Sequence, residues 1–221
     1  FYESTDLINC HSHLTYEMVS EKFPEKTNFI PHSLPPDLFF PMDKNEIRDR
    51  KQEILGSERK DDFVLFWVNR NARRKRPGDL VLAWSEFYKR LEKENPGKRP
   101  QATLLLHTDP LDQEGPNLFE VAKKLGVKES IVFSTNRVEF EQMNVLHNIS
   151  DVCINISYAE GFGLATLESM QCNNPVIATK TGGLTRQVID HRDGTENGIA
   201  LDIDFKSLVG SQQVPYIYED Y

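Results

Sequence analysis

Two kinds of hydrophobic pattern alternate along most of the chain. From about residue 60, short runs that are nearly continuous in apolar residues are separated by longer segments in which apolar positions recur at helical spacing. Strands of a parallel sheet that is covered on both faces require such continuous runs, and the intervening helices supply the two covering layers. The runs that predict strands are Phe63 to Asn69, Ala102 to His107, Ile131 to Ser134, Asp151 to Ser157, Pro175 to Thr179 and Gly198 to Ile203.

The segments between these runs carry the start and stop signals of helices. In residues 77–94, the apolar residues of one helical face are Leu80, Trp84, Phe87 and Leu91. Pro77 starts this segment, Asn-Pro-Gly at 95–97 ends it, and Gly126 predicts the end of the next helix. A third crossover helix is expected between 138 and 150. Six strands and five crossovers predict an α/β fold with a doubly wound, mostly parallel six-stranded Rossmann-like sheet.

The first 42 residues have a different pattern. Residues 6–23 predict a strand and then a helix, and residues 28–41 form a connector with four prolines. We therefore expect residues 1–42 to be the end of a preceding N-terminal domain with an interdomain hinge, and residues 43–221 to be the Rossmann-like domain. The chain starts at Phe1 and ends in an aromatic tail with no clear final element, so we expect a piece of a longer protein, trimmed at both ends.

Composition narrows the classes of partner. The 221 residues carry 26 Lys and Arg against 34 Asp and Glu, a formal charge of -8, which disfavours binding to nucleic acids and anionic membranes. No apolar run approaches the roughly 18 residues of a membrane span. Cys10, Cys153 and Cys172 stand far apart in apolar contexts, which predicts buried thiols in a reducing compartment. We expect a cytoplasmic protein without a nucleic-acid partner.

Two loops are expected to meet at the edge of the sheet. If the six strands take the common order 3-2-1-4-5-6, the topology reverses between the first and fourth strands, and ligands bind in the crevice at their carboxyl ends. The loop after the first strand covers residues 69–77, and the loop after the fourth strand covers residues 158–164. These loops, far apart in sequence, would be neighbours in space.

The two loops together suit a diphosphate. Arg70 and Lys75 bring positive charge, and an arginine fork fits phosphate oxygens. Gly161 and Gly163 leave backbone N–H groups uncovered before a helix that is expected to begin near Leu164, a position that favours anions. The sequence therefore predicts a nucleoside-diphosphate site.

Two glutamates beside this site suit the sugars on either side of a diphosphate. A carboxylate accepts hydrogen bonds from sugar hydroxyls. Glu160, on the loop, is expected to bind a donor sugar, and Glu168, about a turn into the helix, is expected to bind the ribose. Further candidates for contact with the nucleotide sugar are Phe162, Gly182 and Gly183 and, near the base, Asn136 and Arg137.

These residues carry a resemblance to a known family. The sequence resembles the retaining glycosyltransferases of the GT-B fold, specifically glycosyltransferase family 4, in the C-terminal domain that binds the nucleotide sugar. EGFGLATLE at 160–168 is similar to the E-x7-E motif of that family, and NRNARRK at 69–75 is similar to its Gly-Arg-Leu...Lys-Gly element. NPVIATKTGGL at 174–184 and the connector at 29–41 resemble two further elements, so the similarity covers about residues 5 to 205.

The resemblance implies a hexosyltransferase that moves a sugar from a nucleotide-diphosphate donor to a glycan, lipid or protein, with retention and without a metal or other cofactor. The residues matching Arg70 and Lys75 neutralise the leaving diphosphate, and the one matching Glu160 contacts the donor hexose near the reacting centre. The residue matching Glu168 contacts the ribose. The acceptor domain lies largely outside this chain, which leaves peripheral membrane contact through that domain open.

The sequence departs from the family pattern at several positions. Asn69 and Arg76 stand where glycines flank the Arg...Lys element, and Arg186 stands near where a glutamate follows the paired glycines. Arg73, Arg74 and Arg76 are expected to form a solvated charge cluster.

Other interpretations remain open. A nucleotide-sugar epimerase of related fold would bind the same donor, and a non-catalytic binding module would bind it without turnover. A dinucleotide-dependent dehydrogenase is disfavoured because no G-x-G-x-x-G follows the first strand. His11 and His13 suggest a metal site, but no Cys or carboxylate cluster completes it, so we expect no metal. His107 is expected to pack rather than to bind ligand.

Overall fold

The computed structural model describes residues 2–210 and 215–220 of the chain. Its body is a six-stranded sheet in the order β5-β4-β3-β6-β7-β8, and all five neighbouring pairs are parallel. These strands are β3 (Phe63–Val68), β4 (Ala102–His107), β5 (Ile131–Ser134), β6 (Val152–Asn155), β7 (Val176–Thr179) and β8 (Ile199–Leu201). The order confirms the predicted topology, with its reversal between β3 and β6.

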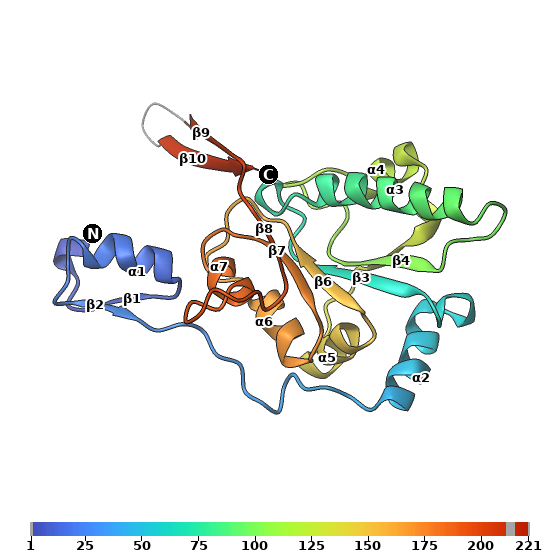
Figure 1. The fold of residues 1–221 in the computed structure, drawn as a ribbon, viewed down its shortest axis with the longest axis horizontal. Helices are drawn as coiled ribbons and strands as arrows, with labels where there is room; N and C mark the ends of the chain where they lie inside the picture. The colour runs from blue at the N-terminus through green and yellow to red at the C-terminus, as the bar shows by residue number, and fades with distance from the viewer. Residues whose placement is uncertain (1, 211–214, 221) are drawn as a thin grey trace.

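Helices cover both faces of this sheet (Figure 1). On one face lie α3 (Pro77–Glu94) and α4 (Leu118–Leu125). On the other lie α2 (Lys44–Leu55), α5 (Phe140–Asn148), α6 (Leu164–Gln171) and α7 (Leu184–Val188). The predicted helix starts and ends are confirmed: α3 begins at Pro77, and Gly126 ends α4 in a left-handed conformation. The helix α2 was not predicted.

The two faces of each strand feed two separate hydrophobic cores. Along β3 and β4, Trp67 and Leu104 belong to the core under α3 and α4, whereas Phe66 and Leu105 belong to the core under α2, α5, α6 and α7. Strands that serve two cores are apolar on both faces, which is why the sequences of β3 and β4 lack the alternation of polar and apolar residues. Trp67 and Trp84 are core residues, as expected.

One predicted core residue of α3 is wrong. Phe87 is 40% exposed, and its neighbour Tyr88 packs into the core instead. The predicted Leu80 and Trp84 are buried and Leu91 packs against the core, so the spacing was wrong only at Phe87. The thiols of Cys10, Cys153 and Cys172 are buried and not in disulfides, as expected, and burial raises the pKa of Cys153 and of Cys172 to about 12.

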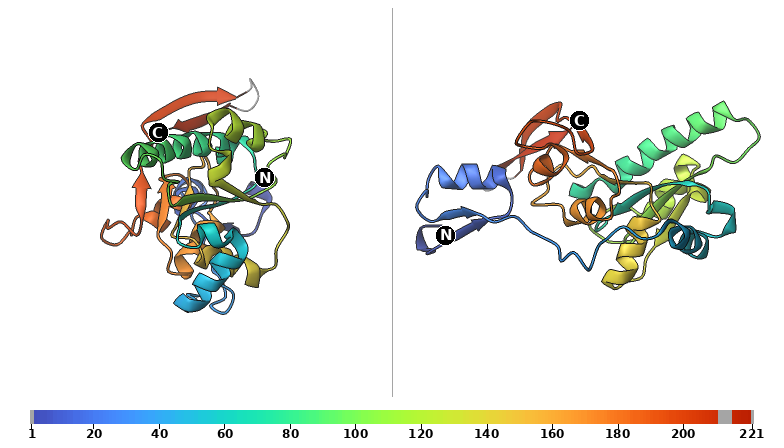
Figure 2. Two further views of the ribbon diagram at one scale, coloured as in Figure 1. Left: turned by 90° about the vertical axis from the view of Figure 1, so that its right-hand side faces the viewer. Right: turned by 60° about the horizontal axis from the view of Figure 1, so that its bottom comes forward.

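A small unit precedes the main body. It consists of β1 (Ile8–Cys10), α1 (His13–Ser20) and β2 (Thr27–Phe29), with β1 and β2 parallel. This order confirms the predicted strand and helix. Figure 2 shows the unit beside the main body and joined to it by a long extended connector. The predicted domain boundary at residue 42 stays a prediction.

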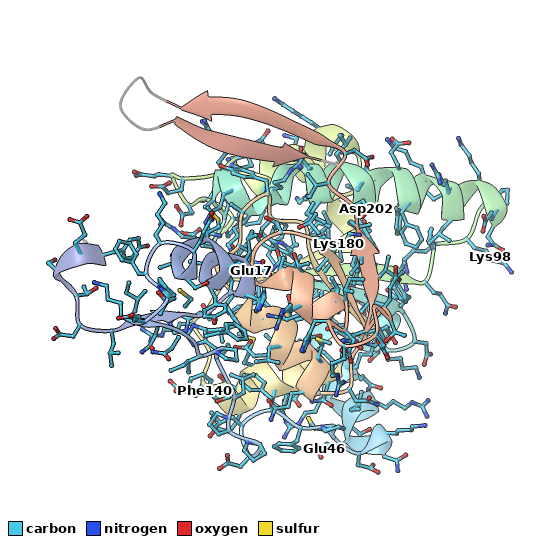
Figure 3. The ribbon with its side chains drawn as sticks, turned by 60° about the vertical axis from the view of Figure 1, so that its left-hand side comes forward. Glu17, Glu46, Lys98, Phe140, Lys180 and Asp202 are labelled. Atoms are coloured by element: carbon cyan, nitrogen blue, oxygen red, sulfur yellow. The ribbon has the colours of Figure 1, made fainter. Side chains whose placement is uncertain are left out.

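In the structure, the connector runs from the end of β2 to the start of α2, residues 30–43, and it is attached to α5. The Phe39 side chain is 1% exposed and packs against Phe140, which Figure 3 labels, with ring centroids 6.3 Å apart. Asn144 accepts a hydrogen bond from the Phe40 N–H (3.1 Å), and Asn148 bonds both the Met42 N–H (2.8 Å) and the Phe40 carbonyl (3.0 Å). Asn144 and Asn148, one helical turn apart, thus bond backbone groups of the connector with their side chains, as a neighbouring strand would do with its backbone.

The chain ends in an element that the sequence analysis did not predict. Strands β9 (Phe205–Gly210) and β10 (Pro215–Asp220) pair antiparallel after β8. The expectation that the tail has no final element is therefore wrong. Before this hairpin, Lys180 at the end of β7 forms an ion pair with Asp202, which follows β8 (Figure 3).

Candidate functional site

The loops after β3 and β6 meet, as the predicted topology requires. The Tyr158 N–H donates to the Arg74 carbonyl (3.1 Å), and Arg74 Nη1 donates to the Ala159 carbonyl (2.7 Å). Arg74 Nη1 also lies 3.6 Å from Glu160 Oε2. Arg74 was expected to belong to a solvated cluster; its side chain is 47% exposed, but it also ties the two loops together, which was not predicted.

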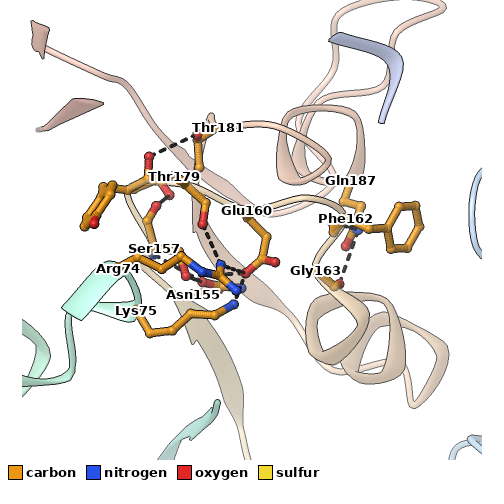
Figure 4. Close-up of polar contacts among 12 residues, drawn as sticks. Arg74, Lys75, Asn155, Ser157, Glu160, Phe162, Gly163, Thr179, Thr181 and Gln187 are labelled. Atoms are coloured by element: carbon orange, nitrogen blue, oxygen red, sulfur yellow. Dashed lines mark hydrogen bonds and ion pairs between the residues drawn. The ribbon is translucent and has the colours of Figure 1, made fainter. Parts of the chain in front are cut away.

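A buried ion pair lies where the loops meet. Lys75 Nζ binds Glu160 Oε2, and the two side chains are 9% and 10% exposed (Figure 4). Burial lowers the pKa of Lys75, and the hydrogen bond and charge of Glu160 oppose that shift. Since breaking a buried pair leaves an uncompensated charge, each partner holds the other in place.

The local backbone around Lys75 explains one departure from the family pattern. Residues Arg73–Lys75 form a short 3-10 turn, and Arg76 follows in the left-handed region with φ 55°. This is the conformation that a glycine at this position would adopt without strain. The Arg76 side chain bonds Asp79 (2.7 Å) and is 11% exposed, so it does not belong to a solvated cluster. Arg73 is exposed.

A cavity of about 340 Å³ opens beside the ion pair. Its lining residues are His32, Asn69, Lys75, Asn155, Glu160, Phe162, Gly163, Leu164 and Ala165. Three of them form the start of α6, which begins as predicted at Leu164 after Gly163 in a left-handed conformation and has no side-chain cap. Uncapped N–H groups and the helix dipole favour an anion here, and Lys75 adds a full positive charge.

Neighbouring elements brace the loop that carries Glu160. Thr179 Oγ1 donates to the Ser157 carbonyl (2.7 Å), and Gln187 Nε2 donates to the Phe162 carbonyl (2.7 Å), as Figure 4 shows. Within the loop, Ser157 Oγ donates to Asn155 Oδ1 (2.6 Å). The loop is therefore held from β7 and α7 before any ligand binds, which is the preorganisation that a charge-stabilising site needs.

The paired glycines support this loop in a way that sequence analysis did not foresee. A Cβ on Gly182 would lie 1.8 Å from the Glu160 carbonyl oxygen, and one on Gly183 would lie 2.4 Å from the Phe162 Cα. The Gly183 N–H donates to the Glu160 carbonyl (3.2 Å). The pair was expected to offer backbone donors to phosphates, but the Gly183 donor is used within the protein. Gly161, by contrast, is exposed and has open space around its Cα.

Arg70 is not part of the central pair. Its guanidinium binds Asp112 through two hydrogen bonds, Nε to Oδ2 (2.7 Å) and Nη2 to Oδ1 (3.1 Å), and its side chain is 63% exposed. The same contact lowers the pKa of Asp112 and raises that of Arg70. The predicted role of Arg70 at a diphosphate stays a prediction, and it requires exchange of this carboxylate for phosphate oxygens.

Glu168 lies in α6 but is engaged with another helix. Its Oε2 is 3.2 Å from Nε2 of His147, a residue of α5 that is 0% exposed. Glu168 does not line the cavity, although it lies on the same helical face as Leu164 and Ala165, which do. Sequence analysis missed His147 because nothing local marks a histidine as the partner of a glutamate 21 positions later.

The remaining residues lie at the carboxyl ends of β4 and β5, on the other side of β3 from the Glu160 loop. Asn136 and Arg137 follow β5 and are exposed, and their predicted contact with the base stays a prediction. His107 ends β4, and its Nδ1 lies 2.8 Å from Ser134 Oγ. Burial is the main reason why the pKa of His107 is lowered, which agrees with the expected packing role.

Asn155 and His32 line the cavity but were not among the predicted site residues. Asn155 is 2% exposed, and its Nδ2 has no hydrogen-bond partner among the described residues. His32 comes from the connector, stacks on His11 with ring centroids 4.1 Å apart, and meets the Phe162 ring edge-on at 5.0 Å. The signal for Asn155 was a polar residue inside an apolar strand, whereas His32 reaches the site only through the path of the connector.

Within residues 2–210 and 215–220, no group of three or more His, Cys, Asp or Glu side chains is placed to hold a metal ion. His13 instead lies 3.3 Å from Glu17. Among the same residues, no helix has the length and apolar character needed to cross a membrane.

Comparison with known proteins places the chain in a family. The sequence model described as Glycosyl transferases group 1 matches residues 48–202. The chain is 33% identical over 174 residues to a D-inositol 3-phosphate glycosyltransferase of Stackebrandtia nassauensis, which covers 77% of this chain and 37% of that protein. The chain thus spans little more than a third of that relative's length.

Solved structures share the fold. HepE of Anabaena, whose structure is a complex with UDP and glucose, superposes with a TM-score of 0.70 at 20% identity, covering 90% of this chain and 50% of that one. The C-terminal domain of the glycosyl transferase group 1 protein LpcC of Francisella tularensis gives a TM-score of 0.57 at 20% identity, covering 77% of this chain and 80% of that one. Since the family model matches more than half of the chain, the protein belongs to the group 1 glycosyltransferases, and its six-stranded sheet is the C-terminal Rossmann-like domain of their GT-B fold.

Proposed function

We propose that this chain is the donor-binding half of a retaining glycosyltransferase of family 4, and that it takes a hexose from a nucleoside-diphosphate sugar without a metal ion. The observation that carries the proposal is the buried Lys75–Glu160 pair at the cavity formed by the loops after β3 and β6 and the uncapped start of α6. Lys75 and the N-terminus of α6 supply positive charge at this cavity, and Glu160 supplies one carboxylate. This combination suits a diphosphate that is joined to a sugar.

The groups present can perform distinct tasks in such a transfer. When the bond between the anomeric carbon and the diphosphate oxygen breaks, its electron pair leaves with the diphosphate, and Lys75 and the α6 N-terminus stabilise that charge. An acceptor hydroxyl attacks the same face and gives its proton to the departing diphosphate. Glu160 binds donor hydroxyls and orients Lys75, and attack on the same face requires no covalent bond between Glu160 and the sugar.

The nucleotide preference can be tested by thermal unfolding of the chain with UDP, GDP or ADP, in EDTA and in Mg²⁺. A ligand at about a hundred times its dissociation constant adds about 2.7 kcal/mol of stability, which is a shift of roughly 5–11 °C for a chain of this size. We expect one nucleotide to give this shift in EDTA, and Lys75→Met to abolish it. Lys98→Met, at an exposed position in the turn after α3 (Figure 3), is the matched control.

The alternatives predict different results. No shift with any nucleotide, from a folded chain, contradicts the donor site, and a shift only in Mg²⁺ contradicts metal independence. In the full-length protein, a nucleotide-sugar epimerase converts the donor sugar without an acceptor, and a binding module leaves it intact even with acceptors. A retaining transferase forms product with the anomeric configuration of the donor, which NMR of the product reports.

A further inference from the structure

The buried histidine beside Glu168 has an unusually restricted environment. His147 is 0% exposed, and its ring is held edge-on between Phe39 of the connector (5.7 Å between centroids, 81°) and Phe66 of β3 (5.1 Å, 84°). Its backbone carbonyl accepts a hydrogen bond from Asn174 Nδ2 (3.1 Å). The plane of the imidazole is therefore fixed by packing, and only one edge of it meets a polar group.

That polar group is the carboxylate of Glu168. His147 Nε2 lies 3.2 Å from Glu168 Oε2, while His147 Nδ1 is buried with no hydrogen-bond partner among the described residues. An ionised carboxylate only accepts hydrogen bonds, so the bond itself assigns the ring proton to Nε2. Nothing else on the imidazole is used, which leaves this one N–H···O bond as the polar role of the residue.

The bond controls where the other carboxylate oxygen points. Side chains on a helix lean toward its N-terminus, so Glu168 leans toward Leu164 and Ala165 at the cavity. Its Oε1 makes no hydrogen bond within the part of the chain that the structure describes, and the side chain is 16% exposed. Oε2 is thus anchored to the protein interior, and Oε1 remains available to a ligand.

We propose that His147 is a positioning residue: by holding Oε2 of Glu168, it directs Oε1 to the ribose hydroxyls of the nucleotide and sets the preference for ribonucleotides over deoxyribonucleotides. The proposal rests on the proposed function, in which Glu168 binds the ribose. A glutamate side chain that is not anchored samples several rotamers, and binding must then pay the entropy of ordering it. A carboxylate that is already held in place avoids this entropy loss, which is the general role of a group that hydrogen-bonds and orients a ligand-binding residue without touching the ligand itself.

The test compares the affinities of ribo and 2′-deoxy or 3′-deoxy forms of whichever nucleoside diphosphate binds, with UDP as the first probe. Glu168→Gln is expected to reduce the ribo-to-deoxy ratio about tenfold, the effect of weakening one hydrogen bond to a charged group. His147→Phe keeps an aromatic ring between Phe39 and Phe66 but removes the N–H, and we expect it to reduce the ratio roughly three- to tenfold. His147→Gln, which restores an N–H at similar reach, recovers most of the ratio.

The outcomes separate the inference from the function on which it rests. If the double variant loses no more than Glu168→Gln alone, the two residues act through one contact, as proposed. If His147→Phe keeps the wild-type ratio while Glu168→Gln loses it, the positioning role is wrong and the ribose contact stands. If the wild-type chain binds no nucleoside diphosphate, the proposed function is contradicted, and the positioning role of His147 is contradicted with it. His191→Phe, at an exposed position, is the control.

A measurement on the unaltered chain keeps the inference testable if the variants do not fold. The ¹⁵N resonances of His147 should report a ring protonated at Nε2, and adding UDP should shift Nε2 whereas inorganic pyrophosphate should not. Protonation at Nδ1, or an equal response to pyrophosphate, would overturn the assignment.

Discussion

The asparagine pair that fastens the connector can be tested by replacing Asn148 with alanine. The carboxamide of Asn148 bonds the Met42 N–H at 2.8 Å and the Phe40 carbonyl at 3.0 Å, and it also bonds the Asn144 carbonyl in its own helix at 2.9 Å. A net contribution of about 1 kcal/mol for each of the two bonds to the connector gives a loss of about 2 kcal/mol. Phe40 is 46% exposed, so water can replace the lost partner there, and no further desolvation cost is added.

The assay is urea unfolding together with chymotrypsin cleavage after Phe39, since the Phe40–Pro41 bond resists this protease. We expect a loss of about 2 kcal/mol, or roughly 4–8 °C in Tm, and faster cleavage because the connector detaches more often. Asn45→Ala, on the exposed side of α2, is the matched control and should change stability by less than about 0.5 kcal/mol. Wild-type stability and unchanged cleavage in Asn148→Ala would refute the claim that these bonds hold the connector.

Three further predictions follow from the site and the core. Glu160→Gln removes the group that opposes the lowering of the Lys75 pKa by burial, so the free energy of unfolding of the variant should be reduced at pH 7. The difference from wild type should shrink as the pH rises through the lowered pKa of Lys75 toward its ordinary value of 10.5, because Lys75 then loses its charge in the folded variant. Urea unfolding at pH 7 and pH 9.5 would report this change. Cys153 and Cys172, with pKa values raised to about 12, should resist a thiol reagent at pH 8 until urea unfolds the chain; rapid labelling of the native protein would contradict their burial. Gly182→Ala places a Cβ 1.8 Å from the Glu160 carbonyl oxygen, so it should weaken nucleotide binding and lower the free energy of unfolding by about 2 kcal/mol or more. Gly97 also has a positive φ, but a Cβ there would meet no atom within 4 Å, so Gly97→Ala measures the effect of the positive φ without a clash.

The sheet could be predicted from sequence because its strands lie between two helical layers. Burial on both faces forces continuous apolar runs, and such runs separated by helical spacing leave few alternatives to a doubly wound sheet. The helix α2 escaped notice because it is largely polar, although Asp43 caps its start and Gly56 follows its end. These signals are local and could have been used.

The partners within the site were harder to predict because they depend on geometry between distant segments. Arg70 and Arg74 carry the same charge, and only the turn at Arg73–Lys75 decides that Arg74 reaches the Glu160 loop. A Gly-Gly pair is compatible with phosphate binding or with close backbone packing, and the approach of the Glu160 carbonyl selects packing for Gly182. Spacing alone carries no information on either choice.

The connector illustrates the same limit. Its four prolines mark it as a connector, and the structure places it between the small unit and α2. Its attachment uses backbone groups of Phe40 and Met42 and side chains more than a hundred positions later, so no local pattern marks Asn144 and Asn148 as its partners.

The most direct test of the central claim is to map nucleoside-diphosphate binding on the chain by ¹H–¹⁵N NMR. We predict that UDP, GDP or ADP shifts the amides of Gly163, Leu164 and Ala165 at the start of α6, together with Lys75, and that Lys75→Met removes these shifts. Shifts confined to a different region, such as the groove between residues 73–79 and 113–116, or no shifts at millimolar nucleotide, would contradict the donor site proposed for this chain.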